Sequence, residues 1–277
     1  MSTRTIVVTV PAELAEIVTD RMWQWGVHAV SETEAASGLV EVATSVGNDE
    51  HSIERACSTL ESAWTVEVRD VDDRIAQVAP AYLSPTWYAA DMVSVPASLT
   101  PFDVDDPTVT VTVIDPGSAF GLGDHPTTRT SMALLAELLR GDAEGCRRLL
   151  DVGCGSGALA VLAAQLGVPT IRAIDIADAA VESTRHNMAL NGVEGAIEVD
   201  TTPLDRVTDT FDIVMANILA PVLVSMSDDL RRVLHPGGSL VISGLLVDRH
   251  DHVVEALRPL VPVRSLQHAG WISIVLR

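Results

Sequence analysis

Three glycines mark the stretch of the sequence whose residue types point most directly to chemistry. The run LLDVGCGSGALA places Gly153, Gly155 and Gly157 between a strand-like segment and a helix-like one. Glycines at such a turn let the backbone approach a ligand closely, and the N–H groups at the start of the following helix attract negative charge. With Ala158, the first two glycines also satisfy the dinucleotide pattern G-x-G-x-x-G/A. The segment therefore predicts a nucleotide site.

Two carboxylates distinguish this loop from an ordinary dinucleotide loop. Asp151 ends the strand before the first glycine, and Asp175 ends the next predicted strand, where it could accept hydrogen bonds from both ribose hydroxyls. With Gly157 they form a set that resembles the S-adenosylmethionine site of class I methyltransferases, in which Asp151 would also face the ligand's ammonium group. Ile176 is expected to contact the same nucleoside. The alternatives are a loop-bracing hydrogen bond for Asp151 and a helix-cap or turn role for Asp175.

A further polar residue, Asn217, ends the apolar strand FDIVMAN and precedes Ile-Leu-Ala-Pro. Side chains at the carboxyl ends of parallel strands face the crevice in which α/β folds bind ligands. The side-chain oxygen of Asn217 and a backbone carbonyl just after it could accept hydrogen bonds from an amine and so direct its lone pair at a sulfonium methyl group. The alternative is that Asn217 caps the helix that follows.

The run AFGLGDHPTT, residues 119–128, places two glycines, a histidine and two threonines at a predicted helix start. Thr127 and Thr128 are expected to bind the cofactor's carboxylate at the helix N-terminus. Phe120 and His125 are expected to cover the methyl-transfer face, and the general base is either His125 or bulk water. The alternative is an ordinary helix cap with a buried histidine.

These positions require a sheet whose strands end at a common edge. From residue 147 onward, strand-like and helix-like runs alternate, which predicts an α/β fold with a doubly wound, mostly parallel, Rossmann-like sheet of seven strands in a domain spanning residues 108–277. The last two strands are joined only by QHAG, which is too short for a parallel crossover. One of them is therefore expected to run antiparallel at the edge.

The N-terminal part predicts a separate small domain. Residues 1–72 show the order β-α-β-β-α-β that is typical of a ferredoxin-like α+β sandwich. Residues 73–107 are richer in proline and small residues and are expected to form a linker with one helix or strand inside it.

Charge and composition narrow the classes of partner. The chain has 38 acidic and 18 basic residues and a net charge of −20, which argues against direct nucleic-acid binding and favours a cationic partner. The alternative is an acidic surface that only aids solubility. No apolar run approaches the roughly 20 residues needed to span a bilayer, and the first residues do not match a secretory signal. The three cysteines lack metal-ligand spacing. We therefore expect a cytoplasmic monomer without a metal or membrane contact.

Three motifs, FGLGDHPTT, D-x-G-x-G-x-G and NILAP, occur in an order and spacing that resembles the PrmA family, the methyltransferases of large-subunit ribosomal protein eleven. The resemblance is strong over residues 115–277. In the residues before 115 it lies in the architecture more than in motifs. It implies S-adenosylmethionine as methyl donor, with contacts at Thr128, Gly153, Asp175 and Asn217. It also implies that lysine side-chain amines and an N-terminal amine of a basic ribosomal protein are the acceptors, and that the N-terminal domain recognises this protein.

The sequence departs from the family pattern at two loop positions. Leu122 and Asp124 stand where the family usually has a small residue or threonine. This leaves two alternatives: a related class I methyltransferase acting on another protein or a small-molecule amine, and a nucleotide-binding regulator without enzymatic activity. An NAD-dependent oxidoreductase is disfavoured, because no proton-donor constellation accompanies the glycine loop.

Overall fold

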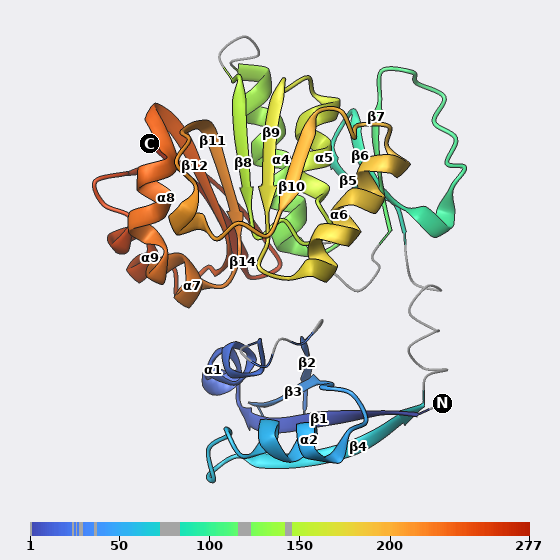
Figure 1. Cartoon of the computed structure of the whole chain (residues 1–277), viewed down its shortest axis with the longest axis vertical. Coiled ribbons are helices and arrows are strands. Elements are labelled where there is room, and N and C mark those ends of the chain that lie inside the picture. The colour runs from blue at the N-terminus through green and yellow to red at the C-terminus, as the bar shows by residue number, and fades with distance from the viewer. Residues whose placement is uncertain are drawn as a thin grey trace. The chain divides into compact units, whose positions relative to one another are not determined.

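The computed structural model describes residues 2–72 except 24, 26, 28, 29, 36 and 37, together with residues 84–115, 123–141 and 146–277. The chain divides into two compact units, Met1–Leu83 and Ser84–Arg277 (Figure 1). Phe120 and Leu122 lie outside the described residues. No helix in the described part of the chain is both long and apolar enough to cross a membrane.

The smaller unit has the predicted β-α-β-β-α-β order. Its elements are β1 (Ser2–Pro11), α1 (Ala12–Trp23), β2 (Val30–Glu34), β3 (Leu39–Thr44), α2 (Glu50–Cys57) and β4 (Thr65–Asp72). All three strand pairs are antiparallel and the strands lie in the order β2-β3-β1-β4. Alternate β1 residues Ile6, Val8 and Val10 are buried with Val18 and Met22 of α1, as the two-residue period of a strand and the four-residue spacing of a helix require. This is the expected ferredoxin-like topology.

The larger unit is built on a seven-stranded sheet in the order β10-β9-β8-β11-β12-β14-β13. Chain order reverses between β8 and β11, which are parallel neighbours, and ligands bind at such switch points in α/β sheets. The elements from this sheet's first strand onward are β8 (Arg148–Val152), α5 (Ala158–Gln165), β9 (Thr170–Ile174), α6 (Asp178–Leu190), β10 (Ile197–Asp200), η4 (Leu204–Arg206), β11 (Phe211–Asn217), α7 (Ala220–Ser225), α8 (Ser227–Val233), β12 (Leu234–Leu246), α9 (Asp251–Ala256), β13 (Pro262–His268) and β14 (Trp271–Leu276).

Helices cover both faces of this sheet (Figure 1). Along β11, Ile213 and Met215 belong to the hydrophobic cluster that includes α4 (Pro126–Gly141), α5 and α6. Their neighbours Val214 and Ala216 belong to a second cluster with α7, α8 and α9. Because successive side chains of a strand point to opposite faces, one apolar strand serves both clusters. The predicted doubly wound α/β fold is confirmed.

The closing strands differ from the prediction in their order. β14 is the antiparallel strand, but it lies between β12 and β13, and β13 takes the edge. The short turn after His268 demands an antiparallel β13–β14 pair without deciding which strand is outermost. The burial of the two strands agrees with this order. Residues Ile272–Leu276 of β14 are buried, whereas most of β13 is exposed.

Part of the segment expected to be a linker is ordered structure in the larger unit. Residues 84–107 contain β5 (Thr86–Ala89), β6 (Met92–Pro96) and the short helix η3 (Ala97–Leu99). β6 pairs in parallel with β7 (Thr110–Ile114), so these strands form a separate three-stranded sheet. β6 is buried throughout, and Tyr88 and Met92 of this proline-containing segment belong to the same hydrophobic cluster as α4, α5 and α6.

Candidate active site

The three glycines of the loop have left-handed backbone conformations. Gly153, Gly155 and Gly157 have φ angles of 70°, 56° and 78°, a region that favours glycine. The N–H groups of Gly153 and Cys154 both donate to the carbonyl of Ile174, at 2.8 and 3.1 Å. The loop is thereby fixed to the end of the neighbouring strand β9.

Asp175 links the loop to the start of α6. Its Oδ2 accepts from the Gly155 N–H at 3.0 Å, and its Oδ1 accepts from the Ala177 N–H at 3.0 Å. The second bond is the turn role that the sequence offered as an alternative, whereas the helix cap itself is Ala177. A carboxylate has about four acceptor positions, so both oxygens retain capacity for further donors. Ile176, the next residue, is 90% exposed.

Asp151 is a buried carboxylate directly before the loop. It is 1% exposed, and no donor within the described ranges reaches either of its oxygens in hydrogen-bonding geometry. The loop-bracing hydrogen bond that the sequence offered as an alternative is therefore not seen there. Burial raises the pKa of Asp151 to about 7, with a further rise from Asp175. The Ala160 amide is near enough to oppose this in part, although it does not reach hydrogen-bonding geometry. The same burial raises the pKa of the Cys154 thiol.

Asn217 ends β11 and meets the first turn of α4. Its Nδ2 donates to Thr128 Oγ1 at 3.5 Å, and the cap of the following helix α7 is Leu219. The structure thus brings Asn217 to the predicted threonine rather than to the helix cap. Thr127 and Thr128 are 1% and 2% exposed. This arrangement leaves Asn217 Oδ1 as the acceptor side of the amide.

Ile218 lies between two glycines of different loops. A Cβ added at Gly153 would lie 2.4 Å from Ile218 Cγ2, and one added at Gly244 would lie 2.4 Å from the Ile218 carbonyl oxygen. Both glycines have positive φ angles. Their missing side chains let the segment after Asn217 pack directly on the glycine loop, so Gly244 is a site-forming residue that sequence reasoning missed.

His125 caps the start of α4. Its Nδ1 accepts from the Thr127 N–H at 3.3 Å and lies 2.8 Å from Thr127 Oγ1. Its ring meets Trp271 edge-on, with centroids 5.4 Å apart. Burial lowers the pKa of His125, opposed by Asp124. Because an N–H can only donate, Nδ1 is an acceptor and the neutral ring holds its hydrogen on Nε2.

A chain of buried hydroxyls also fixes the start of α4. Thr130 Oγ1 and Ser243 Oγ each lie 2.6 Å from Ser273 Oγ. Ser243 Oγ also donates to the Thr127 carbonyl at 3.3 Å. These hydroxyls join α4 to β12 and β14. Sequence reasoning missed all three because only the packing of the helix on the two strands brings them together.

The sequence model of a protein family described as ribosomal protein L11 methyltransferase (PrmA) matches residues 29–277. The chain belongs to this family.

Individual PrmA relatives agree with this assignment. A ribosomal protein L11 methyltransferase from Pelobacter propionicus is 41% identical over 167 residues, which cover 59% of this chain and 54% of that protein. One from Enterococcus faecalis is 31% identical over 242 residues, which cover 86% of this chain and 71% of that protein. The solved structure of the ribosomal protein L11 methylase from Lactobacillus delbrueckii subsp. bulgaricus has a TM-score of 0.64 and 27% identity, covering 70% of this chain and 97% of that one. The matched region spans about half the length of several curated relatives, including the one from Pelobacter propionicus.

PrmA enzymes are class I methyltransferases that use S-adenosylmethionine, and the residues present fit this group. Asp151 and Asp175 place two carboxylates at the glycine loop. Asp175 suits the ribose of either kind of nucleotide. The charged form of Asp151 beside the loop would repel the pyrophosphate of a dinucleotide, whereas it attracts an ammonium or sulfonium group. The partnerless oxygens of Asp151 leave acceptor capacity for that positive charge.

A pH-dependent stability is expected from Asp151. In the folded state its raised pKa keeps a proton bound between about pH 4 and 7, so the carboxyl costs stability progressively as the pH rises through this window. Asp151→Asn should therefore stabilise the ligand-free protein at pH 8 by about 2 kcal/mol more than at pH 5. Urea unfolding at both pH values measures this. Asp178→Asn, at an exposed position, is the control. If Asp151→Asn changes the free energy of unfolding equally at both pH values, this prediction is wrong.

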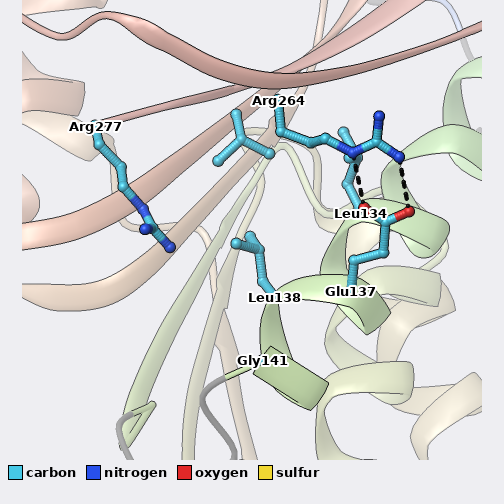
Figure 2. A pocket seen from close by; sticks show the side chains of 7 residues that line it. Leu134, Glu137, Leu138, Gly141, Arg264 and Arg277 are labelled. Atoms are coloured by element: carbon cyan, nitrogen blue, oxygen red, sulfur yellow. Dashed lines mark hydrogen bonds and ion pairs between the residues drawn. The ribbon is translucent and has the colours of Figure 1, made fainter.

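A cavity of about 480 Å³ lies at the other end of α4 from the threonines (Figure 2). It is lined by Leu134, Leu138 and Val275, with Arg264 and Arg277 among the polar residues. Arg264 forms a two-pronged ion pair with Glu137 at 3.0 and 3.1 Å. Because Arg264 belongs to β13, this pair joins the edge strand to α4 and is separate from the site at the loop.

Proposed function

We propose that this chain transfers methyl groups from S-adenosylmethionine to amines of ribosomal protein L11, namely lysine side chains and the N-terminal amine. The observation that supports this best is the contact between Asn217 and Thr128 at the switch point of the sheet. It holds an amide with its acceptor oxygen available beside the glycine loop, which is the group that an attacking amine requires.

The cofactor would be held by residues of three segments of the chain: the end of β8, the turn between β9 and α6, and the start of α4. Asp175 would accept hydrogen bonds from the ribose hydroxyls, with exposed Ile176 against the base. Thr127, Thr128 and the N–H groups at the start of α4 would bind the carboxylate. Asp151 would face the ammonium group. When bound, the cofactor supplies a methyl group activated by a sulfonium.

Asn217 would orient the acceptor amine, because its Oδ1 accepts a hydrogen bond from a neutral amine and directs the lone pair. A lysine amine has a pKa near 10.4, so it must lose a proton before it can attack. Apolar burial favours the neutral form. His125 is a poor base in its observed state, since Nδ1 already accepts from Thr127 and Nε2 holds the hydrogen. We therefore propose that water accepts the proton of the lysine ammonium group. His125 would instead hold the start of α4.

The N-terminal unit would dock the substrate. Residues 1–72 contain 13 acidic residues and four arginines. Of these arginines, Arg69 is already paired with Glu41 and Glu67, and Arg4 with Glu50. The remaining negative charge would attract a lysine-rich protein and speed its encounter with the enzyme.

The direct test uses the purified chain, methyl-labelled S-adenosylmethionine and purified ribosomal protein L11. We expect label on lysine residues and on the N-terminal amine, located by peptide mass spectrometry. L11 whose amines have been blocked chemically is the control and should take up no label. A panel of free amines and of other ribosomal proteins tests selectivity.

Two outcomes would overturn the proposal. Label on a small-molecule amine or on another protein, with none on L11, would support the related methyltransferase instead. Tight binding of the cofactor product S-adenosylhomocysteine, with no transfer to any protein of a ribosome preparation, would support a nucleotide-binding regulator.

A further inference from the structure

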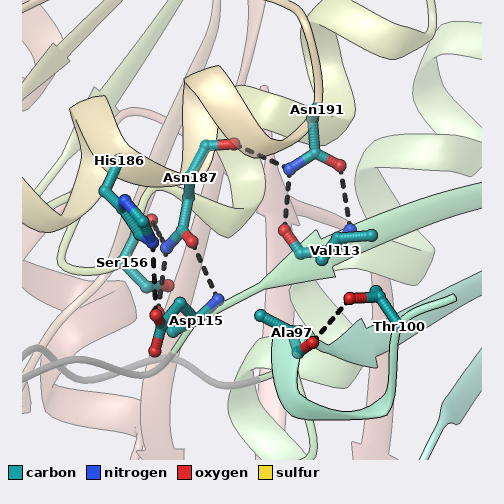
Figure 3. Close-up of polar contacts among 8 residues, drawn as sticks. All are labelled: Ala97, Thr100, Val113, Asp115, Ser156, His186, Asn187 and Asn191. Carbon is teal, nitrogen blue, oxygen red and sulfur yellow. Dashed lines mark hydrogen bonds and ion pairs between the residues drawn. The ribbon is translucent and has the colours of Figure 1, made fainter.

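Asn187 on α6 is a fully buried amide with every polar atom engaged (Figure 3). Its Oδ1 accepts from the Asp115 N–H at 2.8 Å. Its Nδ2 donates to the Asp115 carbonyl at 3.1 Å and to the Ser156 carbonyl at 2.9 Å. Ser156 belongs to the glycine loop, and Asp115 directly follows β7. One side chain thus joins a helix, the glycine loop and the end of the three-stranded sheet.

Thr184 repeats this contact one turn earlier on α6. Its Oγ1 donates to the Gly155 carbonyl at 3.0 Å and lies 3.3 Å from Cys154 Sγ. The packing is close, because a Cβ added at Gly157 would lie 2.7 Å from the Thr184 side chain. Residues three apart share a helix face. Thr184 and Asn187 therefore donate hydrogen bonds to two successive carbonyls of the loop.

These two bonds orient the peptide planes of the loop. In a trans peptide, the C=O of one residue and the N–H of the next point in opposite directions. With the carbonyls of Gly155 and Ser156 directed at α6, the N–H groups of Ser156 and Gly157 face away from that helix, and the Gly157 N–H donates within the loop to the Cys154 carbonyl at 2.8 Å. The loop conformation presented to a nucleoside is therefore set from behind by α6.

We propose that Thr184 and Asn187 are positioning residues for the cofactor, which fix the glycine loop in its binding conformation and, through Asp115, hold it to the end of β7. This inference rests on the proposed function, because the nucleoside is its ligand. Neither side chain needs to touch the cofactor for this role. They act through the carbonyls of Gly155 and Ser156.

The same helix face provides a matched control. Asn191, four residues after Asn187, also binds the backbone of β7: its Oδ1 accepts from the Val113 N–H at 2.8 Å and its Nδ2 donates to the Val113 carbonyl at 2.7 Å. The side-chain hydrogen bonds of Asn191 within the described residues are with Val113, Gln165 and Asn187, and none is with the glycine loop. Loss of either asparagine weakens the junction with β7, but only loss of Asn187 releases the loop.

The experiment compares binding of S-adenosylhomocysteine with thermal stability in the full chain. Asn187→Ala is expected to weaken binding about tenfold, whereas Asn191→Ala should change it by about threefold or less, although both lower the melting temperature. Hydrogen exchange of residues 153–157 without ligand should rise in Asn187→Ala and stay near the wild-type rate in Asn191→Ala. Equal affinities in the two variants would overturn the inference.

Two further measurements keep the outcomes distinct. Thr184→Val removes one hydroxyl and preserves shape, so it tests the same role if Asn187→Ala does not fold, and about fivefold weaker binding is expected. Unchanged affinity in Thr184→Val would then overturn the inference. If the folded wild-type chain binds no S-adenosylhomocysteine, the proposed function fails and the inference fails with it. If the wild type binds and the variants bind equally well, only the inference fails.

Discussion

Asp175→Ala is expected to weaken binding of S-adenosylhomocysteine by about a hundredfold to a thousandfold. The carboxylate already accepts from the N–H groups of Gly155 and Ala177, so its removal frees the loop from the start of α6. It also removes the acceptor that we assign to the ribose hydroxyls. Hydrogen bonds to a charged group are roughly twice as strong as neutral ones, so several losses at one residue give a large effect. Titration calorimetry measures it.

Two controls separate ligand contact from general charge. Asp178→Ala removes an exposed acid of the first turn of α6 and should leave affinity within about twofold. Asp175→Asn keeps one acceptor oxygen and should fall between Asp175→Ala and the wild type. If Asp175→Ala is folded by circular dichroism and binds within about threefold of the wild type, the assigned nucleoside contact is wrong.

The sequence was sufficient for those parts of the fold that local patterns encode. Alternating strand-like and helix-like runs predicted the doubly wound sheet. The glycine spacing predicted a nucleotide loop, and Gly153, Gly155 and Gly157 have positive φ angles that glycine permits. Parallel strands present their carboxyl ends at one edge. For this reason Asp175 and Asn217 could be assigned to one site although they are far apart in the chain.

The parts that the sequence did not predict depend on pairing between distant segments. The insertion of β14 between β12 and β13 and the parallel β6–β7 pair follow from tertiary packing rather than from any local period. The contact of Ser243 with Ser273 lies where the register between β12 and β14 shifts, between Ile242 and Leu245, so no local period of either strand predicts it.

Site chemistry shows the same division. His125 could be named as a candidate base from its type and place, but its tautomer depends on the Thr127 N–H that reaches Nδ1. Asp151 could be named as a carboxylate at the loop, but its raised pKa depends on complete burial by the surrounding sheet. Residue type gave the candidates, and the folded surroundings gave their protonation states.

Asn217 should affect transfer far more than cofactor binding. Asn217→Ala is expected to lower kcat for L11 methylation about a hundredfold or more, since the acceptor amine loses the group that orients its lone pair. The affinity for S-adenosylhomocysteine should change by about fivefold or less, because the contact of Asn217 with Thr128 is a long hydrogen bond of 3.5 Å. Single-turnover rates and calorimetry on the same preparation measure both quantities.

Asn217→Asp provides the sharper test of this role. The carboxylate keeps an acceptor oxygen at the same place, so transfer should recover in part. Its negative charge also favours the ammonium form of the nearby lysine and raises the pKa of that lysine. The pH profile of the remaining activity should therefore move to higher pH than in the wild type. If Asn217 has only a structural role, the pH profile of activity should be the same in both variants as in the wild type. If Asn217→Ala keeps the wild-type kcat, another group orients the amine.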